Sequence, residues 1–415
     1  MNTDVLIIGG GLAGLSCAKT LQDAGVAYLL LEASEALGGR IRTDHVDGFF
    51  LDRGFQVFST AYPEARRILD YAALKLHPFF PGGMIRFHGK WHRMPDPFRH
   101  PLTGLQALFT PIGTLSDKFR VVKLRHRALS GTLNELFTRP ENSTLQYLKN
   151  FRFSSSMIER FFRPFLGGVF LDSELTTSSR MAEFVLRMFA SGDIALPAGG
   201  MEAIPRQLAS YLPSGRIRTH TRVTSVQKTS VTLESGESLA ARAIVVATEG
   251  PAAAELLPRL NPAPYRRVTC LYYAASEPPF SGPYLLLNGE RAGPINNLCV
   301  LTQIAPTYTT TNKQLISVSV LNYADLSEED LATQVRQQLR EWFGSQTTDW
   351  QFIRAYTINA AQPVQVPPFP NPYSGQTQVQ DGVFVCGDFC ATGTIDGAIF
   401  SGRRAADDLR KWLEA

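Results

Sequence analysis

The first thirty residues follow a hydrophobic pattern that predicts a strand, a helix and a second strand. Val5–Ile8 is a short apolar run rich in β-branched residues, and three consecutive glycines close it. Apolar residues then recur at helical spacing as far as about Asp23, with Leu12, Leu15, Ala18 and Leu21 on one face. Tyr28–Leu31 is again apolar. The pattern therefore predicts a βαβ unit at the start of the chain.

Further elements follow from the same patterns. The apolar positions predict strands at 269–273, 315–320 and 383–386, a buried strand at 243–247, antiparallel strands within 216–239, and a hairpin at 85–94 that turns at Gly89 and Lys90. Helices are expected at 204–211, at 328–343 after Ser327 as N-cap, and at 399–413. Residues 76–194 are expected to be mostly helical and irregular, and the proline-rich 363–372 a loop.

Length and composition set the class. A chain of 415 residues with 44% hydrophobic and 19% charged residues is long enough for about two globular domains. No stretch approaches the roughly 18 apolar residues of a membrane span. Five cysteines without CxxC spacing favour a reduced compartment. The N-terminus lacks the basic and small-residue pattern of a signal peptide, so a cytoplasmic location is expected.

The net charge of +4 is unevenly distributed. Residues 79–189 contain 16 Lys and Arg against 8 Asp and Glu, together with 15 of the 26 Phe. Basic amphipathic stretches at 105–109 and 119–129 can lie on anionic lipid, or can be solvated helices with charged outer faces. Nucleic-acid binding is not expected, because no known motif accompanies the basic residues.

The first candidate site is the glycine-rich turn between the first strand and helix. In Gly9-x-Gly11-x-x-Gly14, the first glycine permits the turn, the second admits a pyrophosphate and the third allows close helix packing. Glu32, at the end of the second strand, has the position of an acid that binds ribose hydroxyls. This order of elements predicts a dinucleotide site.

Two further stretches resemble the flavin-containing amine oxidase superfamily. Leu37-Gly-Gly-Arg-Ile-Arg-Thr43 is similar to its second fingerprint, and 383–402, which includes Gly387, Asp388, Gly397 and Ala398, is similar to its C-terminal flavin motif. Weaker matches lie at 196–202, at 221–226 and at 52–56. The resemblance implies non-covalent FAD, because Cys390 lies downstream of the superfamily's covalent position. The residues that it assigns to FAD are Gly9, Gly11, Leu12, Ala13, Gly14, Glu32, Ala33, Gly38, Gly39, Arg40, Gly54, Phe55, Gln56, Val223, Gly387, Asp388, Ile395, Gly397 and Ala398.

The resemblance also implies the architecture. The expected fold class is α/β (α+β), with a Rossmann-like FAD-binding domain of the glutathione-reductase and amine-oxidase type and an inserted substrate domain of mixed sheet and helices. The FAD-binding domain would be discontinuous and comprise 1–75, 195–262 and 375–415. The substrate domain would comprise 76–194 and 263–374.

The substrate remains open at this level. Thr269 occupies the position where many amine oxidases carry a lysine, and Tyr356 is a candidate wall of an amine cage or a strand core residue. The stretches 89–95 and 159–169 look more like protoporphyrinogen oxidase and phytoene-desaturase-like members, which take apolar substrates from membranes. The expected function is therefore hydride transfer from a lipophilic, isoprenoid or tetrapyrrole-like substrate to flavin N5, with oxygen or a quinone as acceptor. Amine oxidation and a non-redox role, as an isomerase or a flavin-binding component of an assembly, are the alternatives, and no metal site is expected.

Overall fold

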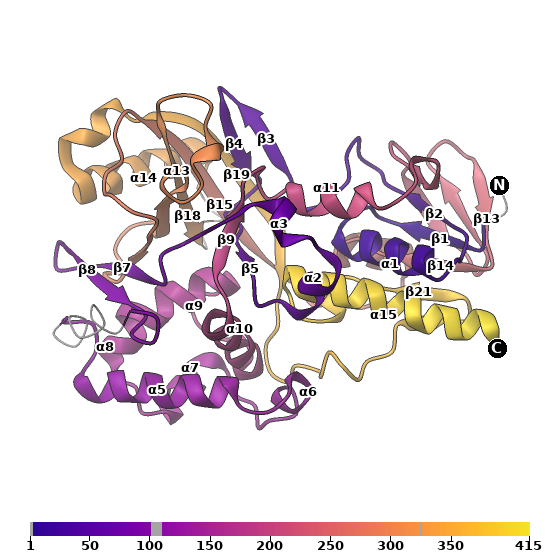
Figure 1. Cartoon of the computed structure of the whole chain (residues 1–415), viewed down its shortest axis with the longest axis horizontal. Helices are drawn as coiled ribbons and strands as arrows, with labels where there is room; N and C mark the ends of the chain where they lie inside the picture. The colour runs from indigo at the N-terminus through magenta and orange to yellow at the C-terminus, as the bar shows by residue number, and fades with distance from the viewer. Residues whose placement is uncertain (1–2, 101–109, 322, 324–325) are drawn as a thin grey trace.

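Six strands from three distant parts of the chain form a mostly parallel sheet. The computed structural model describes residues 3–100, 110–321, 323 and 326–415. The strand order is β10-β2-β1-β14-β21-β20, and only β20 pairs antiparallel. The sheet lies at the right of Figure 1 with both chain termini. Its strands are β1 (Val5–Ile8), β2 (Tyr28–Leu31), β10 (Ile217–Arg218), β14 (Ala243–Val246), β20 (Gln378–Gln380) and β21 (Val383–Val385).

Helices and a small sheet cover the two faces of this sheet. Along β1, Val5 and Ile7 pack into the same core as α1 (Leu12–Asp23) and α15 (Ile395–Glu414). The alternate residues Leu6 and Ile8 pack against the antiparallel strands β11 (Val223–Val226), β12 (Ser230–Leu233) and β13 (Ser238–Ala240). The continuous apolar run of β1 is thus explained by burial on both faces.

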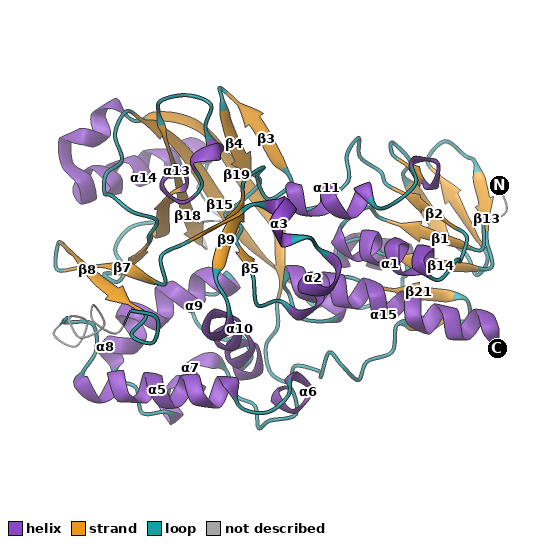
Figure 2. Cartoon of the chain, viewed as in Figure 1, coloured by secondary structure: helices purple, strands orange, loops and turns teal. Residues whose placement is uncertain are grey.

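A seven-stranded sheet forms the other half of the molecule, at the upper left of Figure 2. Its order is β19-β15-β18-β17-β16-β7-β8, and only β16 and β7 pair parallel. The strands are β7 (Gly82–Phe87), β8 (Lys90–Pro95), β15 (Tyr265–Ala275), β16 (Leu285–Asn288), β17 (Ile295–Val300), β18 (Gln314–Leu321) and β19 (Gln351–Pro363). On β15, Leu271 and Tyr273 pack under α14 (Glu328–Phe343), whereas Cys270 and Tyr272 belong to the core of the first sheet.

Helices and short strands complete the described chain. Below the seven-stranded sheet in Figure 1 lie α5 (Leu115–Leu129), α6 (Leu133–Leu136), α7 (Thr144–Asn150), α8 (Ser155–Met157), a π-helical turn (Ile158–Phe162), α9 (Arg163–Phe170) and α10 (Ser179–Ser191). The remaining elements are β3 (Thr43–Val46), β4 (Phe49–Asp52), β5 (Phe58–Ser59), β6 (Leu76–Pro78), β9 (Ile194–Pro197), α2 (Pro63–Ile68), α3 (Tyr71–Leu74), α11 (Ala203–Ser210), α12 (Gly250–Leu256) and α13 (Leu301–Ile304), with 3-10 turns at Ser214–Arg216, Pro306–Tyr308, Gly344–Asp349 and Asp388–Cys390.

Most predicted elements are present, and the expected fold class is confirmed. The strands Val5–Ile8 and Tyr28–Leu31 have the predicted bounds, and α14 begins after Ser327, whose hydroxyl accepts a hydrogen bond from the Asp330 amide. The hairpin turn lies one residue earlier than predicted, at His88 and Gly89, which both adopt positive φ as a type I′ turn requires. All five cysteines are free.

Three expectations need correction or lie outside the structure. α15 begins at Ile395, four residues before the predicted start, because Thr394 caps it by accepting from the Gly397 amide. β10, predicted among antiparallel strands, instead pairs parallel to β2. The stretch 105–109 falls outside the described residues.

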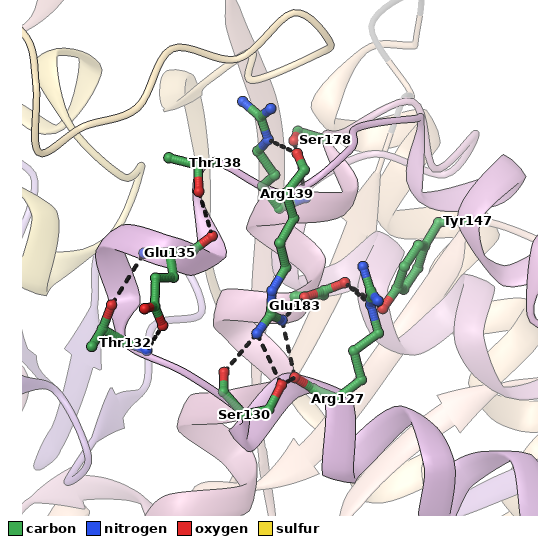
Figure 3. Close-up of polar contacts among 10 residues, drawn as sticks. Arg127, Ser130, Thr132, Glu135, Thr138, Arg139, Tyr147, Ser178 and Glu183 are labelled. Carbon is green, nitrogen blue, oxygen red and sulfur yellow. Dashed lines mark hydrogen bonds and ion pairs between the residues drawn. The ribbon is translucent and has the colours of Figure 1, made fainter.

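A buried carboxylate joins the helices of the lower half. Glu183 on α10 accepts from Tyr147 on α7 at 2.6 Å and from Nε of Arg127 on α5 at 2.7 Å (Figure 3). Arg139, after α6, also pairs with it. Glu183 is only 2% exposed, so its charge depends on these partners.

Replacing this carboxylate should destabilise the protein. We expect Glu183→Ala to lower the free energy of unfolding by about 3 kcal/mol, because it leaves Arg139 without its counter-charge and Tyr147 without an acceptor. Urea denaturation measures the change. Glu237→Ala, which removes an exposed ion pair with Arg218, is the matched control. Equal effects of the two substitutions would contradict a structural role for Glu183.

Candidate functional site: a nucleotide cradle joined to an apolar chamber

One cavity of about 1160 Å³ runs between the two halves of the molecule. One part of it, which we call the nucleotide cradle, is lined by glycine-rich turns, the ends of β1, β2 and β14, and the N-terminus of α15. Another part is lined by aromatic residues from α9 and α10. All the residues that the sequence assigns to FAD line this cavity except Gly14 and Gly397. The structure therefore brings together segments that lie almost 400 residues apart.

Two glycines in the first turn have different reasons to lack a side chain. A Cβ on Gly14 would lie 2.0 Å from the carbonyl oxygen of Gly9, so this residue lets α1 approach β1. A Cβ on Gly11 would meet nothing closer than Cα of Gly39, at 4.0 Å. Because Gly11 lines the cavity, its missing side chain leaves room for a ligand rather than for protein atoms.

Glu32 lies at the carboxyl end of β2 and holds the first turn. Its Oε2 accepts from the Gly10 amide at 2.7 Å, and its Oε1 accepts from the amide and hydroxyl of Ser34 at 2.8 Å. The carboxylate also lines the cavity. It is therefore both fixed in orientation and available to ribose hydroxyls.

An ion pair joins the second fingerprint to the C-terminal motif. The guanidinium of Arg40 lies 2.8 Å from Oδ1 of Asp388 and donates to the carbonyl of Ala361. Burial alone would lower the pKa of Arg40, but Asp388 raises it, so the charge is retained inside the protein. Thr394, Ile395 and Ala398 line the same part of the cavity, so the positive end of the α15 dipole faces it.

Two buried polar atoms in the cavity lack a protein partner. Gln56 donates its amide hydrogens to the carbonyls of Arg40 and Arg53, while its Oε1 accepts nothing. The hydroxyl of Thr248, after β14, is likewise unpartnered. Both residues line the cavity, and a buried polar group without a partner is costly. A polar ligand such as FAD would satisfy them, so the residues present fit this cofactor.

A residue that sequence reasoning passed over positions this turn. Asp52 is buried and accepts from the Thr43 hydroxyl at 2.6 Å, the Met201 amide at 2.9 Å and the Tyr308 hydroxyl at 2.8 Å. Burial raises the pKa of Asp52 to about 6, although these hydrogen bonds lower it. Its main-chain carbonyl also accepts from Tyr272. Asp52 thus fixes the turn Arg53–Gln56 against three segments that are distant from it in sequence, those of Met201, Tyr272 and Tyr308.

The aromatic residues of the basic segment gather in the second part of the cavity, which we call the apolar chamber. It is lined by Phe79, Phe161, Phe162, Phe165, Phe189 and Leu285. Phe161 stacks on Phe165 at 5.4 Å between ring centroids, and Phe165 meets Phe189 edge-on at 5.0 Å. The sequence signal for this chamber is the density of Phe in 79–189.

The two candidate catalytic residues do not line the cavity. Thr269 hydrogen-bonds Thr357 on the neighbouring strand, and the hydroxyl of Tyr356 donates to Asp44 at 2.6 Å. Val268 and its partner on β19, Ile358, line the cavity instead. Because side chains alternate between the faces of a strand, Thr269 lies on the face opposite Val268, whereas Tyr356 lies on the same face as Ile358, two residues away along β19. Within the described residues, no group of three or more His, Cys, Asp or Glu is arranged as a metal site.

The fold and this cavity define a dinucleotide-binding protein whose nucleotide cradle opens into an apolar chamber. A sequence profile of the family described as flavin containing amine oxidoreductase matches residues 12–410. The chain belongs to this family, which confirms the resemblance found in its sequence and implies FAD as cofactor.

Individual relatives match over shorter stretches. The chain is 36% identical to 15-cis-phytoene desaturase of Arabidopsis thaliana over 117 residues, and 36% identical to putrescine oxidase of Kocuria rosea over 101 residues. These matches cover 25% and 24% of this chain and 20% of each relative. Among solved structures, a protoporphyrinogen-oxidase-like protein of Exiguobacterium sp. 255-15 has a TM-score of 0.75 at 18% identity, over 100% of both chains. The last comparison supports the fold alone.

The contrast between the two glycines gives a test of the cradle. We expect Gly11→Ala to fold normally but to reduce the FAD content of the purified protein about tenfold, because the added methyl projects into ligand space. Flavin absorbance relative to protein absorbance measures this content. Gly14→Ala, whose methyl would overlap the Gly9 carbonyl, should instead lower the thermal unfolding temperature. Full FAD content in Gly11→Ala would contradict the assignment.

Proposed function

We propose that the protein is an FAD-dependent oxidoreductase that dehydrogenates an apolar substrate. The observation that carries this proposal is the apolar chamber, which is continuous with the nucleotide cradle and lined by phenylalanines. Such a lining favours an isoprenoid or tetrapyrrole-like molecule over a small charged amine, because an ammonium group is costly among apolar side chains without a partner. The likeness to a phytoene desaturase supports the same substrate class.

Different residues of the cavity would bind the cofactor and the substrate. Bound FAD would supply the acceptor for a hydride from a substrate C–H bond, and oxygen or a quinone would reoxidise it. Glu32 and the glycine turns would hold the nucleotide, and the N-terminus of α15 would favour negative charge on the bound cofactor. The chamber orients the apolar substrate and excludes water, so no side chain of the chamber has to act as a base.

The cofactor is proposed to bind non-covalently. Attachment requires a nucleophilic side chain in the cavity, and none of the five cysteines or seven histidines lines it. Cys390, which lies within the C-terminal motif, has its pKa raised to about 12 by burial. Denaturation should therefore release the flavin from the protein.

Anaerobic reduction tests the substrate class. We expect phytoene in detergent to bleach the bound flavin, and putrescine or cyclohexylamine to leave it oxidised. Val169→Asp, which places a charge in the chamber, should slow reduction by phytoene at least tenfold while retaining FAD. Val379→Asp, at an exposed strand position, is the matched control. Bleaching by amines alone would support the amine oxidase alternative, and turnover that needs reduced flavin without net oxidation would support an isomerase.

A second proposal concerns the source of the substrate. The outer face of α5 exposes Leu115, Phe119, Val122 and Leu129, and Phe119 is 75% exposed. These positions share one side of the helix, and its inner side lines the cavity with Val121 and Leu124. Lys123 is exposed beside the apolar stripe. Within the described residues, no helix has the length and apolar character to cross a membrane. We therefore propose that α5 lies on the surface of an anionic membrane and that the substrate enters from it.

Vesicle co-sedimentation tests this contact. We expect binding to phosphatidylcholine vesicles that contain phosphatidylglycerol at low salt, and about tenfold weaker binding for Phe119→Ser, since burial of one such side chain contributes about 1.5–3 kcal/mol. Phe352→Ser removes a 43% exposed ring on β19 and should not change binding. No sedimentation of the unaltered protein with these vesicles would overturn the proposal.

A further inference from the structure

Three cationic side chains line the end of the cavity that lies far from the nucleotide cradle. Lys118 and Arg125 come from the inner face of α5, and Arg99 comes from the segment after β8. In Figure 1, α5 is at the lower left, whereas β1 and α1 are at the right. A ligand group held by these cations would thus be separated from the cofactor by the apolar chamber.

The two arginines already have partners. Arg99 pairs with Asp193 at 2.6 Å and lies 3.7 Å from Asp96. Arg125 lies 3.9 Å from the same Asp96 and donates to the carbonyl of Ala190. The two aspartates therefore largely compensate the charges of the arginines. The arginines can donate hydrogen bonds to a ligand but add little net positive charge.

Lys118 is different because its contacts are all with uncharged groups. Its Nζ donates to the carbonyl of Ile112 at 2.5 Å, and it has longer contacts with the hydroxyl of Thr110, at 3.4 Å, and the sulfur of Met94, at 3.9 Å. No carboxylate among the described residues lies within 4 Å of it. Burial lowers the pKa of Lys118 to about 8 against the opposing effect of the Asp117 charge, so burial of the ammonium carries a cost. An anion beside it would remove this cost.

The position of Lys118 is fixed by the residue before it. Asp117 caps α5 by accepting from the amide and the hydroxyl of Thr114, and it also accepts from the amide and hydroxyl of Ser154. Burial would raise the pKa of Asp117, but these hydrogen bonds hold it down at about 2. Asp117 is therefore committed to Thr114, Ser154 and Arg120. It holds the start of α5 in place and leaves Lys118 to a ligand.

We propose that this end of the cavity binds the carboxylate of an apolar substrate, with Lys118 as its counter-ion. The inference rests on the proposed function and narrows it from an apolar molecule to an amphiphile with one acidic end. A single ammonium without a carboxylate contact matches the single charge of a carboxylate. The acidic end stays at the cations, and the apolar body extends through the chamber toward the cofactor. This arrangement selects which carbon of the substrate faces the flavin.

Displacement of a fluorescent fatty acid tests the proposal on the FAD-loaded protein. cis-Parinaric acid serves as the probe, because its fluorescence rises in an apolar cavity, and oleate and oleyl alcohol serve as competitors. We expect oleate to displace the probe at about tenfold lower concentration than oleyl alcohol, since a charge-assisted hydrogen bond contributes more than a neutral one. Lys118→Met should weaken binding of the probe, which has a carboxylate of its own, and should remove the preference for oleate, while the dissociation constant of oleyl alcohol, corrected for the affinity of the probe, stays unchanged.

Lys123→Met is the matched control, since Lys123 lies on the same helix but faces outward. It should retain the preference for oleate. Equal displacement by oleate and oleyl alcohol, or the same preference in Lys118→Met as in Lys123→Met, would overturn the carboxylate site and leave the apolar chamber as proposed. If the probe itself did not bind, both this inference and the proposed apolar substrate would fail.

Discussion

The close contact between the first and last helices is the constraint on which the nucleotide cradle depends. A Cβ on Gly402 of α15 would lie 2.0 Å from the carbonyl oxygen of Ala13 on α1, so the two helices approach until their backbones nearly touch. The hydroxyl of Ser16 donates to the carbonyl of Ile399 across the same contact, at 2.8 Å. Because both helices begin at the cavity, this contact sets the distance between the glycine turn and the C-terminal motif. The cradle therefore exists only when the two ends of the chain have docked.

The local parts of this arrangement were predictable from the sequence, because each is encoded by a few adjacent residues. The turn Gly9–Gly14 and the acid Glu32 lie within one βαβ unit, whose periodicity is visible without any tertiary information. The start of α15 was not predicted correctly, because glycines near it obscure the helical pattern in the sequence. Gly397 and Gly402 lower helix propensity, yet each is glycine because another backbone lies within about 2 Å of its absent Cβ. At Gly402 the close backbone is that of Ala13 on α1, so tertiary packing overrides local preference, whereas at Gly397 it is that of Thr392, just before the Thr394 cap.

The position of side chains on the long strands was not predictable. Along β15 the register with β19 shifts between Arg266 and Val268, and such an irregularity moves every later side chain relative to its partner strand. A resemblance can thus align Thr269 with a catalytic position while Val268 is the residue that lines the cavity. Asp52 was overlooked because its three donors come from three separate segments. Only the folded chain brings them together.

The basic, phenylalanine-rich segment 79–189 looks uniform in the sequence, but in the structure some of its side chains are buried and others are exposed. Phe161, Phe165 and Phe189 point into the chamber, whereas Phe119 points to solvent from the outer face of α5. The lysine and arginine side chains of this segment also differ in their surroundings. Arg127 and Arg139 neutralise the buried Glu183, which holds α5 against α10, and this packing in turn holds the inner face of α5 over the cavity. The surplus positive charge of the segment is consequently not a diffuse surface property. Part of it is paired with Glu183 inside the protein and positions α5, and another part, Lys118 and Arg125, lines the cavity.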